Sequence, residues 1–189
     1  MRLIVTTLAL FLGCRPAPPP AAVDARADHP PLDCPAGTHP TGSAPPMGLE
    51  AWCERQLPDG SRLREGPSTT WHANRQIAAS GTFVTGKRTG PWEFYFPNGQ
   101  VERRGLYVGG VEEGLWTTFH PDGSKKSEGE MVDGREHGPW TYWDLDGSSI
   151  TGRWNLGRRE GVWVIHDAEG QPVAERVYEN GRLVGMRGL

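Results

Sequence analysis

A repeated segment of about 24 residues constrains this chain of 189 residues more than any other feature. A glycine opens each copy, and successive opening glycines are separated by 24, 24, 24, 23 and 24 residues: Gly66, Gly90, Gly114, Gly138, Gly161 and Gly185. A unit this short cannot bury an apolar face alone, so neighbouring copies must stack to build a shared core. The spacing therefore predicts an elongated repeat architecture over residues 66–189.

Each copy has the turn residues of a β-hairpin. Asn98-Gly99, Asp122-Gly123 and Asp146-Gly147 place Asn or Asp before a glycine, and tight hairpin loops need a residue there that tolerates φ > 0. A second set of glycines turns the chain into the next copy: Gly86, Gly110, Gly134, Gly157 and Gly181. Two strands in each of about five copies predict about ten strands, and the fold class is an all-β, elongated antiparallel meander of tandem hairpins.

Three positions in each copy carry large side chains. Two residues after the opening glycine lie Ser68, Trp92, Trp116, Trp140 and Trp163. Five residues after it lie Trp71, Tyr95, Phe119, Trp143 and His166. The second strand contributes Phe83, Tyr107, Met131, Trp154 and Tyr178. The first two positions are an odd number of residues apart, so they face opposite sides of a regular strand. The recurring tryptophans predict a packing ladder, and the other aromatic row is a candidate packing or binding surface.

The composition favours many short strands over helices. Glycine (26 residues) and tryptophan (8 residues) are both abundant, which suits tight turns and a core filled by rings. The net charge of −3 leaves no basic excess to neutralise phosphates, so nucleic-acid binding is disfavoured.

The first 33 residues indicate export and anchoring. Residues 1–13 contain Arg2 and an apolar run, Leu3 to Leu12, which is too short to span a bilayer and is typical of a signal peptide. The run ends in Leu12-Gly13-Cys14, which resembles the bacterial lipobox. That resemblance implies lipidation of Cys14 and a membrane anchor, with an outer-membrane lipoprotein facing the periplasm as the expected location. Residues 14–33 are rich in proline and predict an extended tether.

Two cysteines remain after Cys14, namely Cys34 and Cys53. An exported compartment is oxidising, so they predict one disulfide. A metal site would need more ligands than these two cysteines and His39 provide. Residues 34–65 are expected to form an N-terminal cap, with one capping strand between Leu49 and Cys53.

The pattern of Gly-x-Trp, Asn-Gly and Gly-x-Tyr in residues 66–185 resembles the MORN repeat. It is closest to the variant form found in tandem in bacterial proteins, including YwqK-like antitoxins. The resemblance implies a β-hairpin ribbon, and the functions of such arrays range from scaffolding and dimerisation to membrane association.

The sequence contains no recognisable catalytic constellation. His72 and His120 occupy the same position two copies apart, about 20 Å on a regular ribbon, and no Gly-x-Ser-x-Gly elbow exists. We therefore expect a non-enzymatic protein without a cofactor.

The remaining sequence signals concern partners. The hairpin turns carry Asp and Asn, whereas the connecting turns carry arginines and lysines diluted by glutamates, so the ribbon is expected to have one acidic and one mixed edge. We expect protein–protein interaction or scaffolding with another envelope protein. Glycan binding and toxin neutralisation are the alternatives. An apolar patch rimmed by charge would favour a protein partner, and an exposed aromatic stripe with polar flanks would favour a glycan.

Overall fold

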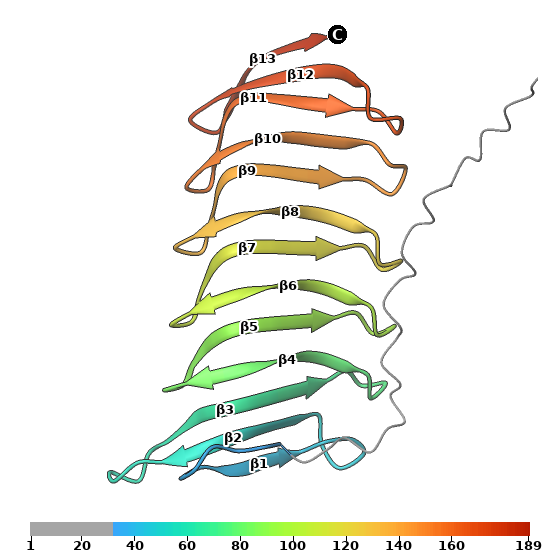
Figure 1. Cartoon of the computed structure of the whole chain (residues 1–189). Helices are drawn as coiled ribbons and strands as arrows, with labels where there is room; N and C mark the ends of the chain where they lie inside the picture. The colour runs from blue at the N-terminus through green and yellow to red at the C-terminus, as the bar shows by residue number, and fades with distance from the viewer. Residues whose placement is uncertain (1–31) are drawn as a thin grey trace, which may run out of the picture.

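A computed structural model describes residues 32–189 and shows them as one open antiparallel sheet of thirteen strands. Every strand pairs with its neighbours in sequence, from β1 to β13, without a crossover. Figure 1 shows the strands stacked one above another, with turns along the two sides. The predicted signal peptide, Cys14 and most of the tether lie outside the described residues.

The strands have the following bounds: β1 His39–Ser43, β2 Glu50–Gln56, β3 Arg62–Trp71, β4 Ile77–Val84, β5 Lys87–Tyr95, β6 Val101–Val108, β7 Val111–Phe119, β8 Lys125–Val132, β9 Arg135–Trp143, β10 Ser149–Asn155, β11 Arg158–His166, β12 Pro172–Glu179 and β13 Arg182–Gly188. Strands β3 to β12 are the ten strands expected of five hairpin units. The other three strands lie at the two ends of the sheet.

The hairpin turns, which join the two strands of one unit, share one geometry. In the turn that follows β7, the backbone N–H of His120 donates to Ser124 O and that of Gly123 donates to His120 O. Asp122 accepts the backbone N–H and the hydroxyl of Ser124, and these bonds lower the pKa of its carboxyl. In the first unit Arg75 replaces the turn glycine and still adopts a φ of 71°.

The connecting turns, which join one unit to the next, are two-residue turns with positive φ at both positions, the requirement of a type I′ turn. Asp133-Gly134 and Asn180-Gly181 are two of them. The second residue also donates its N–H to the neighbouring unit, as Gly134 does to Glu112 O at 3.0 Å. The turns therefore add hydrogen bonds between units along one side of the sheet.

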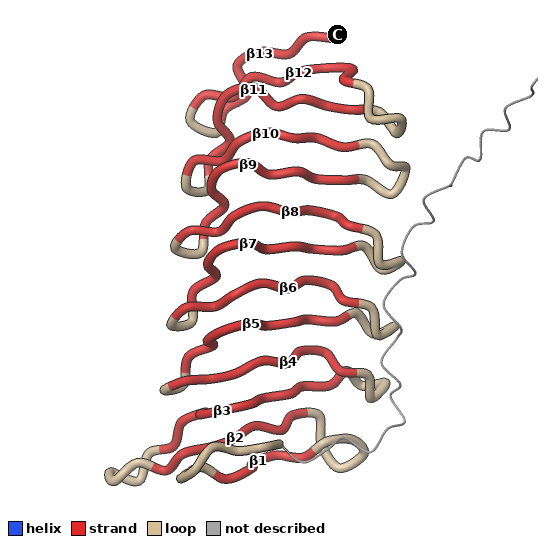
Figure 2. The backbone as a smooth tube through the Cα atoms, in the orientation of Figure 1, coloured by secondary structure: helices blue, strands red, loops and turns tan. Residues whose placement is uncertain are grey.

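The opening glycines mark a bulge where successive units pair. Between β6 and β7 the register jumps from Arg104↔Thr117 to Leu106↔Glu113, which leaves more residues on β7 than on β6. Gly114 lies in this bulge with a φ of 68°, a conformation that favours glycine. Figure 2 shows the backbone bending just after each connecting turn. The bulge explains why each unit must open with glycine.

The single 23-residue spacing results from a missing second bulge. In the other four units the second strand has one extra residue near the hairpin turn; in β8, for example, Lys126 lies between the partners of Thr118 and Phe119. The β9–β10 pairing runs in continuous register from Ser149↔Trp143 onward. The fourth unit is therefore one residue shorter without any change in the stacking of its strands.

The cap contains two strands rather than the single strand expected. β1 and β2 form a hairpin, and β2 pairs with β3, which begins within the expected cap range. The disulfide joins Cys34 to Cys53, and Cys53 is fully buried. A β-carbon on Gly66 would lie 2.6 Å from Pro35 and 3.2 Å from Cys53. The disulfide-linked segment is therefore packed directly against the first repeat.

Candidate binding surfaces

One face of the sheet, here called the tryptophan face, carries the buried tryptophans. Trp92, Trp116, Trp140 and Trp163 are at most 5% exposed. Each ring lies over a glycine of the preceding unit: a β-carbon on Gly105 would be 2.3 Å from the Trp116 ring. The indole N–H of Trp116 donates to Leu106 O at 3.2 Å, and Trp92 and Trp140 make equivalent bonds. These contacts tie each unit to its predecessor.

The remaining aromatics of this face contact the same ladder. Tyr107 meets Trp92 and Trp116 edge-on, with ring centres 6.1 and 5.3 Å apart. Tyr142 is stacked between Trp140 and Trp163 at 5.7 and 5.9 Å. Burial and a hydrogen bond to a glutamate raise the pKa of both tyrosines. The rings therefore form two clusters, one that ends at Trp116 and one that begins at Trp140, and Met131 lies in the core between them.

The row of Trp71, Tyr95, Phe119, Trp143 and His166 is less well packed than the ladder. Trp71 is buried, and the other four are intermediate in exposure. Cations cover two of the rings: Arg104 lies 5.3 Å from the centre of Phe119, and Lys125 lies 5.8 Å from that of Trp143. Strand alternation places this row on the face opposite the tryptophans, here called the opposite face.

The opposite face also carries an exposed apolar row near the connecting turns. Leu115 is 61% exposed and Leu106 46%, and Pro91, the partner of Leu106 in register, is exposed beside them. Pro139 and Val162 are exposed further along the row, where Glu130 and Arg153 interrupt it. Pro91, Leu106 and Leu115 line a hollow of about 490 Å³ with polar walls: Ser80, Glu93, Arg104, Thr117, Lys125 and Glu128. This row was not predicted from the sequence, although Pro91, Leu115, Pro139 and Val162 all directly follow an opening glycine.

Charged residues that were expected at the edge instead cover the tryptophan face. Arg88 lies 4.6 Å from the centre of the Trp92 ring, and Arg159 lies 4.7 Å from that of Trp163. The equivalent residues of the two middle units are Glu112 and Glu136, which accept hydrogen bonds from tyrosine hydroxyls. The expected edge pattern was therefore wrong for these four side chains, because each pairs in register with a large apolar or aromatic residue that packs on the ladder: Phe83, Tyr107, Met131 and Trp154.

The tryptophan face has a hollow of about 370 Å³ between Trp116 and Trp140. Thr118 and Ser127 line it, and their hydroxyls bond to each other at 2.7 Å. At the position of Thr118 the neighbouring units have Phe94 and Tyr142. The hollow exists because the third unit lacks a ring at this position.

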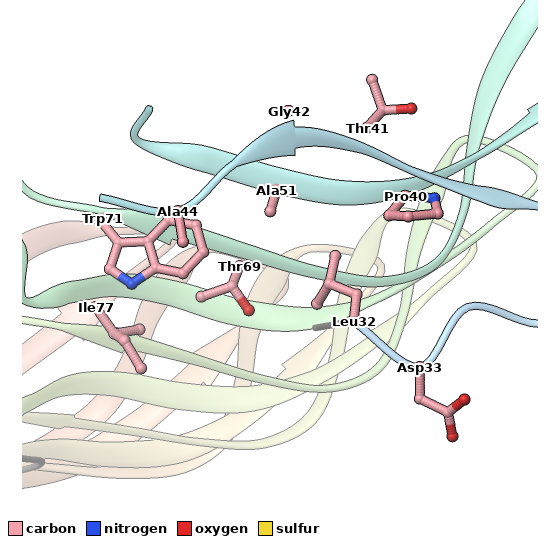
Figure 3. Close-up of a pocket in the computed structure, with 10 residues that line it drawn as sticks. All are labelled: Leu32, Asp33, Pro40, Thr41, Gly42, Ala44, Ala51, Thr69, Trp71 and Ile77. Atoms are coloured by element: carbon pink, nitrogen blue, oxygen red, sulfur yellow. The ribbon is translucent and has the colours of Figure 1, made fainter. Parts of the chain in front are cut away.

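A third hollow, of about 420 Å³, lies where the cap meets the first repeat. Figure 3 shows Trp71 and Ile77 on one side of it, with Leu32 near Thr69 and Pro40. Its lining is mainly apolar, and Asp33 is the only charged residue in it. Part of its wall is the first segment that the structure describes.

The histidines within the described residues do not form a metal site. His72 and His120 bond to the carbonyl oxygens of Tyr95 and Trp143 in the following unit, at 2.7 and 2.9 Å. Within residues 32–189 no group of three or more His, Cys, Asp or Glu side chains is placed to hold a metal ion. Residues 32–189 also contain no helix long and apolar enough to cross a bilayer.

Comparison with known proteins identifies the repeats. Residues 88–108 and 112–133 match the family model of the MORN repeat variant. No protein of curated function matches the chain. The two matched segments are β5–β6 and β7–β8 with their hairpin turns. The ladder tryptophan recurs in the following hairpin, β9–β10, whereas the preceding hairpin, β3–β4, has Ser68 at that position. The chain is therefore similar to the MORN repeat variant over residues 88–133.

Proposed function

We propose that the chain is a non-enzymatic binding module whose opposite face docks a partner protein. The observation that carries this proposal is the exposed apolar cluster of Pro91, Leu106 and Leu115, which line one hollow. Apolar side chains that lie together on a surface and are rimmed by charge are typical of protein interfaces. The hydrogen-bonded sheet beneath the row supplies a rigid platform for such an interface.

The charged residues beside the row support a protein partner. The Glu128 carboxylate accepts hydrogen bonds from the Lys125 ammonium at 2.8 Å and the Thr117 hydroxyl at 3.2 Å. The Glu93 carboxylate accepts a hydrogen bond from the Tyr95 hydroxyl at 2.6 Å. These bonds hold the polar rim in place. A rim that contains both positive and negative charges orients a protein partner without attracting polyanions.

The same contacts make a glycan a less suitable ligand for this face. Sugars stack on exposed faces of aromatic rings, whereas Arg104 and Lys125 cover Phe119 and Trp143. The Tyr95 hydroxyl is already bonded. A protein that packs against the leucines needs none of these rings to be free.

Site-specific crosslinking tests the proposal. A photoreactive residue at position 115, introduced in cells that naturally express the chain, should give one discrete protein adduct. The same residue at position 145, where Leu145 is exposed in a hairpin turn, is the matched control and should give none. Leu106→Arg should abolish the adduct and change the free energy of unfolding by less than about 0.5 kcal/mol.

Two outcomes would contradict a protein partner. One is an equal adduct at positions 115 and 145. The other is retention of the chain on purified peptidoglycan with no protein adduct at 115, which would favour the glycan alternative. Toxin neutralisation is a special case of the proposal, in which the crosslinked protein is a toxin whose activity falls on addition of the chain.

We further propose that the module is held at the bacterial envelope by a lipid on Cys14. The lipobox-like Leu12-Gly13-Cys14 after the apolar run supports this location. Cys14→Ser should move the chain from the membrane fraction to the soluble fraction, whereas Cys34→Ser should leave it in the membrane. Unchanged fractionation of the Cys14→Ser variant would contradict the anchor.

A further inference from the structure

The chain covers most of its own tryptophan face with arginines. Arg64 lies 4.5 Å from the centre of the Trp52 ring and 5.4 Å from that of Phe83. Arg88 lies within 5.4 Å of Trp92, Phe94 and Tyr107, and Arg159 within 5.4 Å of Trp154, Trp163 and Tyr178. A guanidinium over a ring face is attracted by the ring quadrupole. In three units this position therefore holds a cation among rings.

The two middle units have a carboxylate at this position. Glu112 and Glu136 replace the arginine, and each pairs in register with the second-strand residue that contacts the ladder, Tyr107 and Met131. In the third unit Arg103 partly replaces the missing arginine, since it bonds Glu112 at 2.7 Å and lies 5.3 Å from the centre of the Trp116 ring. Among the described residues, no cation lies over the ring of Trp140.

The hollow beside Trp140 has space and a free acceptor. Its volume is about 370 Å³, and Met131 lines it together with the two tryptophans. Glu136 uses Oε1 to accept the Tyr142 hydroxyl at 2.7 Å, and no described residue bonds its Oε2. The hollow therefore combines ring surface with an acceptor on a charged group, as small ligand sites do.

Two cations, Arg103 and Arg135, also line this hollow. Arg103 is neutralised by Glu112. Arg135 is exposed at the rim, where a β-carbon added to Gly157 of the next connecting turn would lie 3.9 Å from the Arg135 β-carbon. Glu136 is thus the one carboxylate of the hollow without a cationic partner in the described part of the chain.

We propose that this hollow binds the guanidinium group of an arginine supplied from outside the chain. The bound cation would take the place that Arg88 and Arg159 take in their own units, near Trp140 and bonded to Glu136. Charge-assisted bonds to a carboxylate are short and directional, so a neutral isostere should bind much more weakly. The inference concerns the tryptophan face and is independent of the proposed docking surface on the opposite face.

Titration with blocked arginine tests this site. Nα-acetyl-arginine amide should bind saturably and shift the indole N–H resonances of Trp140 and Trp116. Nα-acetyl-citrulline amide has the same shape without the charge and should bind at least about tenfold more weakly. Equal binding of the two compounds, or no saturable binding up to about 10 mM, would overturn the proposal.

Substitutions locate the site. Glu136→Gln should weaken binding of the arginine compound about tenfold. Glu136→Arg should abolish binding, because it restores the internal arginine found in other units, and thermal unfolding will show that the fold is retained. Glu128→Gln, on the opposite face, is the matched control and should bind like the unmodified chain. Unchanged binding by Glu136→Gln would place the ligand elsewhere and overturn the proposal.

A comparison of arginine sources refines the assignment. Free arginine and a Gly-Gly-Arg-Gly-Gly amide peptide present the same guanidinium. Tighter binding of the free amino acid would identify a small-molecule ligand, and tighter binding of the peptide would identify a protein side chain. Both results support the site, whereas a preference for the citrulline versions of either ligand would overturn it.

Discussion

The two faces of this ribbon use aromatic residues in different ways. On the tryptophan face the same residue recurs in four consecutive units, at most 5% exposed and seated on a glycine of the unit before. On the opposite face the aromatic row changes from Trp71 through Tyr95, Phe119 and Trp143 to His166, and most of it is half-buried. The first position is fixed by packing against the neighbouring backbone, whereas the second tolerates several side chains.

This difference separates stability from binding. A side chain that fills a backbone hollow can vary little, because interiors are close-packed. Beside the variable aromatic row lie the exposed Leu106 and Leu115, which contribute little to the core. The tryptophan face therefore holds the units together, and the opposite face is free to carry a docking surface. The middle units are the exception, because there the tryptophan face itself has a hollow.

The largest expected effect is that of Trp116→Ala. Replacing a buried aromatic by alanine costs about 3–5 kcal/mol of folding free energy. Because the units contact only their neighbours, a loss in the middle should uncouple the array. Trp116→Ala should therefore lower the melting temperature more than Trp163→Ala, measured by thermal and denaturant unfolding. A small, equal loss in both variants would show that the ladder is not the core.

Gly105→Ala should give the next largest loss of stability, because the Trp116 ring packs directly on the backbone of Gly105. The added β-carbon would lie 2.3 Å from Trp116, and overpacking of this kind costs about 1–3 kcal/mol. Gly188→Ala is the matched control, since nothing lies within 4 Å of its β-carbon. Equal stability of these two variants would mean that the contact between Gly105 and the Trp116 ring has no role in unit stacking.

Phe119→Ala examines the opposite face and should cost less. The ring is intermediate in exposure and has Arg104 at 5.3 Å, so we expect a loss of about 1–2 kcal/mol, roughly half that of a fully buried aromatic. Denaturant unfolding of Phe119→Ala and Trp116→Ala under the same conditions gives the ratio of their losses in free energy of unfolding. A loss as large as that of Trp116→Ala would remove the distinction between the two faces.

The sequence predicted the repeat, the hairpins and the two faces because these depend on periodicity alone. The 24-residue spacing, the Asp-Gly turns and the odd separation between Trp92 and Tyr95 are all local signals. The placement of Arg88 and Glu136 on the tryptophan face was missed, although each is four residues before a ladder tryptophan and an even separation predicts the same face. Their proximity to turn residues had suggested an edge role instead.

The hollow beside Trp140 depends on neighbours that no single unit encodes. Thr118 and Ser127 come from one unit, and Trp140 and Glu136 come from the next. Only the cross-strand register brings them together. Of the two cap strands, only β1 was missed, for a related reason: it is polar and short and is defined by its pairing with β2 and by the disulfide.

The smallest expected effect is on the ionisation of Tyr95. Its hydroxyl bonds Glu93 on the opposite face, as the hydroxyls of Tyr107 and Tyr142 bond glutamates on the tryptophan face. Burial, and then the hydrogen bond and charge of Glu93, raise the pKa of Tyr95 from 10.0 to about 12. A tyrosine with a raised pKa in the folded state stabilises the fold fully below its unfolded pKa, and the contribution is lost as the pH rises from 10 to 12.

Ultraviolet absorbance titration, taken as the difference from Tyr95→Phe, should therefore show that Tyr95 ionises at a higher pH than a free tyrosine. Glu93→Gln removes the charge but not the burial, so the pKa should fall only part of the way towards 10.0. An unchanged pKa in Glu93→Gln would show that burial alone sets it, and that the bonded rim of the opposite face does not constrain this ring.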